Sequence, residues 1–297
     1  PEPLPLERVA DAAHCSPFHF HRLFKRVTGE TLTAFVTRMR LERALHRLAH
    51  GPAGPLTEIA LDAGFNSASD FSRRFRAQYG IAPSRFDLDA YRRERRGALD
   101  ALSRIDRTAE AVHGNADGDS NPIEVVVREL PARTVAYVRV LDPYRADVVP
   151  DAAKRLEHWA DATGHGDGTW LGYMWDDPEI VPLERCRYDV GVELCPGAAA
   201  DFRPIGEIGR FDFPAMTIAE VQVRGPIERE MEALDHLFGP WLEAAGYVPT
   251  DQPCFEAWHG RPFASGDNWF ELDIQLPVAP ATCLPAPGRR PAPARGR

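Results

Sequence analysis

A stretch near the N-terminus, SPFHFHRLFKRVTG (residues 16–29), places two histidines, three phenylalanines and three cations within fourteen residues. Such a set could coordinate a metal, fill the core of a helical bundle, or contact a polyanion. His19 and His21 are two positions apart, so on a helix they point to different faces. Because zinc needs ligands that converge from one side, we expect no metal site here.

The same arrangement recurs about fifty residues later. Residues 71–80, FSRRFRAQYG, repeat the pattern of residues 20–29, FHRLFKRVTG. Ser16 followed by proline is typical of a helix start, and the glycine that ends each segment is typical of a helix stop. The preceding apolar positions repeat as well: Leu6, Val9, Ala10 and Ala13, then Leu56, Ile59, Ala60 and Ala63. This internal repeat predicts two helix-turn-helix units joined by a long helix over residues 33–50, which incidental histidines in a core helix would not explain.

The second helix of a helix-turn-helix unit lies in the major groove of DNA. The outward positions of the two second helices predict the DNA-binding residues: Phe18, His21, Arg22, Lys25, Arg26, Ser69, Ser72, Arg73 and Arg74. Arginine can pair with O6 and N7 of guanine, whereas Lys25 and Arg26 suit phosphates, which position the protein without specifying sequence. The remaining apolar positions of the first such helix are expected to pack inward: Phe20, Leu23, Phe24 and Val27.

Residues 6–86 resemble the DNA-binding domain of AraC/XylS-family transcription regulators. The resemblance rests on LERVADAAHCSPFHFHRLFKRVTG, on RMRLERALHRL and on IALDAGFNSASDFSRRFRAQYGIAPSRF. It implies that the two second helices enter successive major grooves on one face of the DNA. Residues 1–5 stand where the family has a further helix, so we expect a truncated start. Asp70 lies near the predicted DNA face and would repel phosphate unless Arg73 or Arg74 pairs with it.

Charge divides the chain into two parts. The first 98 residues hold 16 Lys and Arg against 11 Asp and Glu, whereas the remainder holds 19 against 33. A basic part and an acidic part suggest different partners, and 297 residues are enough for about two domains. The chain has no apolar run of about 20 residues, and because it shows no n-region and h-region we expect no signal peptide. Five scattered cysteines without a CxxC pair favour a reducing compartment, and we expect a cytoplasmic protein.

The composition of the second half predicts its boundaries. We expect a DNA-binding domain over residues 1–97, a linker over 98–121, a second domain over 122–279 and a disordered tail over 280–297. Within the second domain, AYVRV at 136–140 recurs as AEVQV at 219–223. The order strand, helix, strand, strand occurs twice. The sequence thus predicts an all-α double helix-turn-helix domain followed by an α+β domain of duplicated βαββ halves.

Two carboxylates stand in apolar strands of the second domain. Glu256 lies in CFEAW and Asp273 in FELDIQLPV. Burying a carboxylate is costly unless a partner pairs with it, and a cationic ligand stacked on aromatic rings is one such partner. Tyr173, Trp175 and Trp258 could supply the rings. Plain core packing of these aromatics and a solvated role for the carboxylates remain alternatives.

Residues 122–279 resemble the GyrI-like effector-binding domain, which occurs in some AraC-type and MerR-type regulators. The resemblance rests on the order of several loose motifs: residues 127–140, YDVGVEL, FDFPAMTIAEVQVRGP, FGPWLEAAGYVPTDQPCFEAW and ELDIQLPV. It implies that Glu256 binds lipophilic cations in a cleft between the two halves, and that Asp273 occupies a second acidic position. Gln275 stands where the family often has an aromatic residue, so the identity of the ligand stays open.

These features predict a one-component transcription regulator. We expect it to bind double-stranded DNA and a small organic, cationic effector, with RNA polymerase as a further candidate partner, and to need no cofactor and no membrane. Two alternatives stay open. The second domain could hydrolyse a small electrophile with Glu256 as general base and Tyr173 as proton donor, or it could bind a partner protein.

Overall fold

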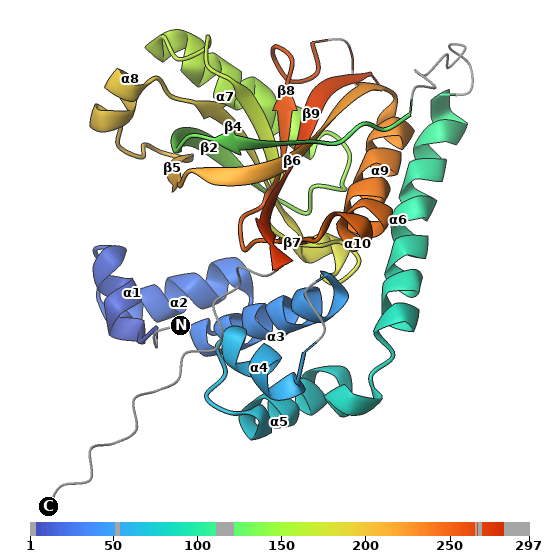
Figure 1. The fold of residues 1–297 in the computed structure, drawn as a ribbon. Coiled ribbons are helices and arrows are strands. Elements are labelled where there is room, and N and C mark those ends of the chain that lie inside the picture. The colour runs from blue at the N-terminus through green and yellow to red at the C-terminus, as the bar shows by residue number, and fades with distance from the viewer. Residues whose placement is uncertain (1–3, 51–53, 111–121, 265, 267–268, 282–297) are drawn as a thin grey trace, which may run out of the picture. The chain divides into compact units, whose positions relative to one another are not determined.

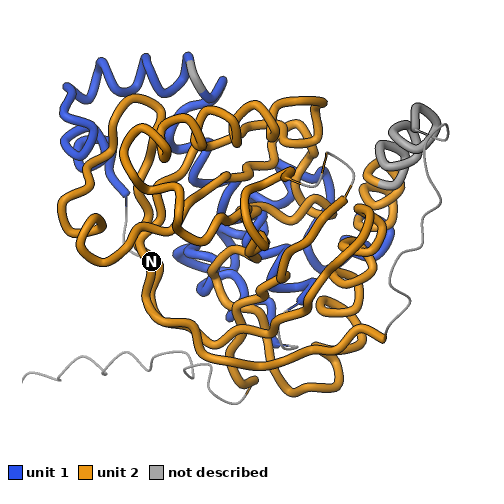
Figure 2. Tube along the Cα trace, turned by 90° about the horizontal axis from the view of Figure 1, so that it is seen from above, with its two compact units in different colours: residues 1–91, 285–297 blue, residues 92–284 orange. Residues whose placement is uncertain are grey.

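The computed structural model describes residues 4–50, 54–110, 122–264, 266 and 269–281. The described residues up to Tyr91 form one compact unit and those from Arg92 form another (Figure 2). The division falls within a long helix, α6 (Leu88–Glu110), whereas the sequence placed the first boundary at residue 97. Among the described residues, no helix is both long and apolar enough to cross a bilayer. Residues 98–110 of the predicted linker belong to α6, whereas residues 111–121 and 282–297 lie outside the described residues.

The first unit is helical and repeats internally (Figure 1). Its elements are α1 (Leu6–Ala12), α2 (Pro17–Thr28), α3 (Leu32–His50), α4 (Leu56–Asp62), α5 (Ala68–Tyr79), a 3-10 turn (Pro83–Arg85) and the start of α6. Helices α1 and α4 each have seven residues, and α2 and α5 each have twelve. The predicted pair of helix-turn-helix units joined by one long helix is therefore confirmed.

The two helix-turn-helix units differ in how tightly they pack. In the second helix-turn-helix unit, Phe71 and Phe75 on α5 are completely buried. On α2, Phe24 is half-buried and meets Phe35 edge-on at 5.4 Å. Leu23 is 48% exposed, so the expectation that it packs inward is wrong: α2 packs on α1 and α3, and these contacts leave much of the Leu23 side chain in solvent. The side chain of Val27 lies outside the described set.

The second unit is built on one antiparallel sheet. Its strands are β1 (Val126–Leu130), β2 (Arg133–Leu141), β3 (Trp170–Met174), β4 (Arg187–Glu193), β5 (Ile208–Phe213), β6 (Met216–Gly225), β7 (Tyr247–Pro249), β8 (Cys254–Trp258) and β9 (Phe270–Pro280). They follow the order β1-β6-β9-β8-β3-β4-β2-β5, and β7 pairs with β9. The helices of this unit, besides α6, are α7 (Val148–Thr163), α8 (Pro196–Asp201), α9 (Ile227–His236) and α10 (Leu242–Ala245), with a 3-10 turn (Leu183–Arg185) before β4 and a π-helical segment (Leu237–Trp241) between α9 and α10.

The predicted duplication is present. One half contains β2, α7, β3 and β4, and the other contains β6, α9, β8 and β9. The halves meet where β3 pairs with β8, and Gly172 lies directly opposite Glu256 in that pair. The junction between the halves therefore passes through the residue that the sequence singled out.

Two short connections make the sheet curve. Only Pro131 and Ala132 separate β1 from β2, and only Pro214 and Ala215 separate β5 from β6, although β1 and β5 end the strand order on opposite sides. The connections therefore bring the two edges of the sheet toward each other. One apolar cluster contains residues from both edges and marks the inner face: Leu130, Val135, Leu171, Tyr173, Phe213, Met216, Ile218, Phe255 and Ala257. Helices α7 and α9 pack on the outer face, in a separate cluster.

Candidate nucleic-acid interface and ligand site

Helices α2 and α5 are fixed at both ends by their own sequences. The side chain of Ser16 accepts the His19 N–H at 3.3 Å, and that of Ser67 accepts the Asp70 N–H at 3.1 Å. Gly29 and Gly80 end the helices with φ of 77° and 76°. Because this left-handed region suits glycine, the sequence specifies where each helix stops.

Most of the predicted DNA contacts on α2 are accessible. Phe18 is 72% exposed, and the guanidinium of Arg22 lies 5.7 Å from the centre of its ring. Arg22, Lys25 and Arg26 are exposed, whereas His21 is half-buried. One side of α2 thus presents cations and an aromatic ring to solvent.

On α5 the predicted contacts divide between solvent and the protein interior. Ser69 and Arg73 are exposed, and Ser72 is half-buried. Arg74 is also half-buried, and it donates to Asp70 at 2.9 Å and to Thr37 Oγ1 on α3 at 3.1 Å. Arg74 therefore holds α5 against α3.

The pairing expected for Asp70 is confirmed. Its Oδ1 accepts from Arg73 at 2.6 Å and from Arg74 at 2.9 Å. Partial burial would raise the pKa of Asp70, but the hydrogen bonds and charges of these arginines outweigh that effect and lower it. The carboxylate is thus neutralised beside the face that is predicted to meet DNA.

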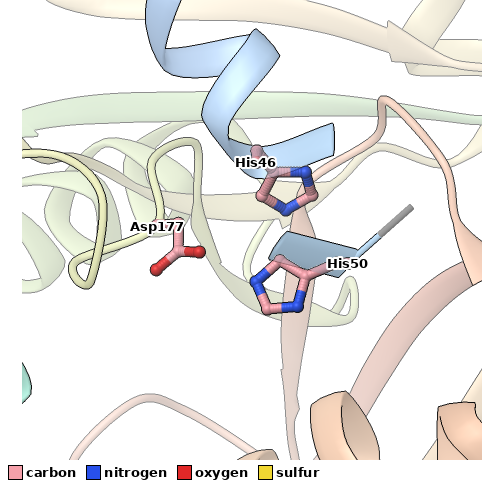
Figure 3. A group of neighbouring side chains, drawn as sticks. All are labelled: His46, His50 and Asp177. Atoms are coloured by element: carbon pink, nitrogen blue, oxygen red, sulfur yellow. The ribbon is translucent and has the colours of Figure 1, made fainter. Parts of the chain in front are cut away.

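Helix α3 ends in a pair of histidines. His46 and His50 lie one turn apart on the same side of the helix, with ring centroids 4.9 Å apart (Figure 3). Histidine near a helix C-terminus interacts favourably with the carbonyl end of the helix dipole. Asp177, drawn in the same figure, belongs to the second unit, where its carboxylate accepts the Glu179 N–H at 2.8 Å.

In the second unit, polar side chains converge between the sheet and α9. The Tyr188 hydroxyl on β4 donates to Oε2 of Glu256 on β8 at 2.5 Å. Glu230, on α9, hydrogen-bonds to the same carboxyl group. Gly172 on β3 leaves the space for this contact, because a Cβ at that position would lie 1.8 Å from the Tyr188 hydroxyl and 2.6 Å from Oε2 of Glu256.

The two carboxyl groups share an unusual electrostatic environment. Burial raises the pKa of Glu256 to about 7, although hydrogen bonds from Tyr188 and Glu230 counteract it in part. The pKa of Glu230 is raised by burial and by the charge of Glu256. Two carboxyls in contact do not both ionise readily. Glu230 keeps the proton, because the carboxylate of Glu256 is stabilised by a further hydrogen bond from Tyr188. Neither carboxyl group makes a described ion pair with a cation.

Aromatic and sulfur-containing side chains surround this pair. The Tyr144 hydroxyl lies 3.3 Å from the sulfur of Met174, and the indole of Trp258 hydrogen-bonds to Tyr188. Cys254 is a free thiol whose pKa is raised by burial and by Glu256. Glu256 remains partly accessible to solvent, as do Cys254, Met174 and Tyr144. The carboxyl pair thus lies beneath a soft, apolar rim.

The structure separates the five predicted ligand residues. Glu256 and Trp258 face outward toward the helices, whereas Tyr173 and Trp175 pack on the inner face. Asp273 also lies on the inner face, away from the helices, and its Oδ2 is 3.0 Å from Nε2 of His259. The expected pair of Glu256 and Tyr173 is therefore wrong: neighbours along a strand point to opposite faces, and Gly172, not Tyr173, stands opposite Glu256.

The sequence contained signals for the side chains that do meet Glu256. Glu230 occupies the apolar stripe of its helix, three and seven positions before the buried Ala233 and Leu237. A carboxylate in such a stripe is as notable as one in a strand. An isolated glycine within a strand, as at Gly172, often marks a close approach of another group. Tyr188 carries no comparable signal, because a tyrosine in a strand usually packs in the core.

Comparison with known proteins supports both units. A family described as "GyrI-like small molecule binding domain" matches residues 123–279, and one described as "Helix-turn-helix domain" matches residues 9–88. The Transposon Tn10 TetD protein of Escherichia coli is 36% identical over 97 residues, which are 33% of this chain and 66% of that protein. The Transcriptional regulator Rob of Salmonella typhimurium is 36% identical over 83 residues, 28% of each chain.

These relatives share only a part of their length with this chain. AdaA of Bacillus subtilis, a bifunctional transcriptional activator and DNA repair enzyme, is 35% identical over 85 residues, 29% of this chain and 40% of AdaA. The crystal structure of the EcmrR C-terminal domain aligns with 54% of this chain and 99% of its own, with 18% identity and a TM-score of 0.40. The N-terminal unit is an AraC-type helix-turn-helix domain, and the chain belongs to the family of the GyrI-like small molecule binding domain.

Proposed function

We propose that the protein is a transcription regulator that binds double-stranded DNA through α2 and α5 and binds a small organic cation beside Glu256. The observation that carries the ligand half is the contact between the buried Glu230 and the partly accessible Glu256, which make no described ion pair with a cation. A ligand cation would take the place of the proton on Glu256 and neutralise its carboxylate, while Glu230 stays protonated. The aromatic and sulfur-containing rim suits an apolar cation rather than a metal ion.

Helix α9 is the element best placed to admit such a ligand. It carries Glu230 and is followed by a π-helical segment in which Gly239 adopts φ −110° and ψ −105°, directly before Pro240. Interrupted helices bend at such points. A shift of α9 about this kink would widen the space around Glu256 without disturbing the sheet.

The same helix offers a route toward the DNA-binding unit. Arg96 on α6 donates two hydrogen bonds to Asp235 on α9, at 2.6 and 2.7 Å. Arg92, also on α6, donates to Glu179 at 2.8 Å. Because α6 begins at Leu88, within the first unit, a ligand that moves α9 would act on the helix that leaves the DNA-binding unit. Regulation then requires only that the ligand favour one arrangement of α9 over another.

The DNA-binding half is tested by selecting a preferred duplex from a random pool and measuring affinity by fluorescence anisotropy. Arg22→Ala and Arg73→Ala should each weaken binding to the selected site by about 1–3 kcal/mol and relax its specificity. Lys25→Ala should weaken all duplexes alike and lower the salt dependence by about one unit. Arg155→Ala, which removes an exposed cation of the second unit, is the matched control. Unchanged affinity and specificity in both Arg22→Ala and Arg73→Ala would refute the assignment of the recognition helices.

The ligand half is tested by calorimetry with tetraphenylphosphonium and its neutral analogue triphenylphosphine oxide. We expect tetraphenylphosphonium to bind well and its neutral analogue to bind poorly. Glu256→Gln should lower the affinity for the cation by at least about tenfold, because the attraction between a carboxylate and a cation in such a site contributes more than about 1.4 kcal/mol. Affinity should rise as the pH rises through about 7, because the cation requires the ionised carboxylate of Glu256. Equal binding of the neutral analogue, or equal binding to Glu256→Gln, would contradict the proposal.

A hydrolytic function is a second candidate, favoured by one observation. A carboxyl group whose pKa is about 7 is suited to general-base catalysis near neutral pH, and Tyr188, which hydrogen-bonds to it, could donate a proton. Turnover of a panel of small electrophiles that is lost in both Glu256→Gln and Tyr188→Phe would support this function. Absence of turnover with the wild-type protein, under conditions where the cation binds, would reject the hydrolytic function and retain the sensor function.

A further inference from the structure

Two arginines on the inward side of β2 differ in their partners. Arg139 donates to both carboxylate oxygens of Asp189, at 2.8 and 2.7 Å. Arg133 lies six positions earlier on the same side of the strand and is only 7% exposed. One of its terminal nitrogens lies 3.4 Å from Gln275 Oε1. Its Nε and its other terminal nitrogen have no hydrogen-bond partner among the described residues.

The unpartnered donors of Arg133 lie among aromatic rings. Its guanidinium is 4.2 Å from the centre of Phe255 and 5.9 Å from that of Phe213. Tyr173 packs on the same two rings, at 5.5 and 5.4 Å, and its buried hydroxyl also lacks a described partner. Burial lowers the pKa of Arg133 to about 10, so the side chain remains charged at neutral pH. A charged group with two unpartnered nitrogens and a neutral hydroxyl thus flank one pair of rings, and these three donors have no acceptor among the described residues.

The acidic and amide groups nearby do not accept hydrogen bonds from the unpartnered donors of Arg133 and Tyr173. Gln275 is oriented by Glu220, which accepts its Nε2 at 2.9 Å, so only its oxygen is available to Arg133. Glu220 is itself neutralised by Arg128. Glu193 attracts Arg133 electrostatically but makes no described ion pair with it. Asp189, the fully buried carboxylate, is occupied by Arg139.

We propose that the interior of the curved sheet is a second ligand site, which binds an aromatic carboxylate. Its carboxylate would accept from Arg133 and Tyr173, and its ring would pack against Phe213 and Phe255. The planar fork of a guanidinium matches the two oxygens of a carboxylate, as Asp189 and Arg139 already show on the same face. This site has the opposite charge preference to the one at Glu256, and does not depend on it.

Two exposed turns flank Arg133 and Phe213 at the edge of the inner face. Arg133 directly follows the exposed turn at residues 131–132 and pairs with Phe213, which directly precedes the exposed turn at residues 214–215. Leu130 and Met216, at the other ends of these turns, each retain 8% exposure. A carboxylate that enters between the two turns would therefore meet Arg133 first.

Calorimetry on the full chain with 2-naphthoate and its uncharged amide tests the proposal. We expect the carboxylate to bind and the amide to bind at least tenfold more weakly. Arg133→Met, which keeps the length of the side chain but removes its charge, should lower the affinity for 2-naphthoate at least tenfold. Arg155→Met, on the outer face, should leave that affinity unchanged. Glu256→Gln should also leave it unchanged, and this separates the result from the fate of the cation site.

A second variant covers the case in which Arg133→Met fails to fold. Tyr173→Phe removes a hydroxyl that has no described partner, so it should unfold at the same temperature as the wild type or higher, and yet bind 2-naphthoate severalfold more weakly. Failure of the wild type to bind 2-naphthoate, or binding that survives both Arg133→Met and Tyr173→Phe, would overturn the proposal. The donors of Arg133 would then be satisfied by water.

Discussion

On the outer face of the sheet, Glu230 and Glu256 contact each other with no base paired to them among the described residues, whereas on the inner face the buried Arg133 makes no described ion pair with an acid. Both arrangements are costly, but the two faces differ in how they can reduce the cost. A carboxyl group can take up a proton, and the pKa of Glu256 is already raised to about 7. Arg133 stays charged even with its pKa lowered to about 10. Glu256 can therefore respond to pH, whereas the cost of burying Arg133 can be reduced only by an anion.

The largest effect should come from removing the carboxylate of Asp189, which pairs with Arg139 on the inner face. Asp189→Asn leaves Arg139 without its carboxylate and weakens the contact from the Trp175 indole, now 2.6 Å from Oδ2 of Asp189. Breaking a buried pair costs about 3–5 kcal/mol, and we expect the low end because the Arg139 side chain is 37% exposed. Urea unfolding measures the loss. Asp212→Asn, at an exposed pair with Arg210, should cost less than about 1 kcal/mol; equal losses would mean that the inner face does not bury its charges.

The next prediction concerns the space that the outer pair needs. Gly172→Ala would place a methyl group 1.8 Å from the Tyr188 hydroxyl and force apart the contact between Tyr188 and Glu256. Overpacking of this kind costs about 1–3 kcal/mol, and cation affinity should fall with it. Gly197→Ala, at a helical position with open space around it, should be neutral or slightly stabilising in thermal unfolding. A neutral Gly172→Ala would show that the contact is dispensable.

The last prediction is a pH dependence of stability that comes from the outer face. Because burial raises the folded-state pKa of Glu256 to about 7, above its ordinary value, the folded protein binds more protons than the unfolded chain between about pH 4.5 and 7. The free energy of unfolding should therefore fall by roughly 1–3 kcal/mol as the pH rises through this window. Chemical unfolding at several pH values measures the slope. Glu256→Gln should flatten it, whereas Arg133→Met should not.

The sequence predicted the elements well and the faces poorly. Apolar spacing and capping residues are local, so Ser16, Gly29 and Gly80 marked three of the ends of α2 and α5 correctly. Whether Glu256 meets Tyr173 or Tyr188 depends on strand register, and a shift of one residue reverses the face. The register between β3 and β8 is set by contacts across 84 positions, which no local pattern encodes. The exposure of Leu23 was missed for a similar reason, because it depends on which helix covers α2.

The strand order also carries a consequence for biosynthesis. The last strand, β9, is central: it pairs with both β6 and β8, so without it the sheet is divided. The helix-turn-helix unit is complete once Tyr91 has left the ribosome, whereas the sheet must wait for Pro280. Local helical contacts also form faster than long-range strand pairs. We therefore expect a nascent or prematurely terminated chain to acquire its DNA-binding fold before it acquires a ligand site, and a nonsense mutation before β9 to produce a DNA-binding fragment that ignores the effector.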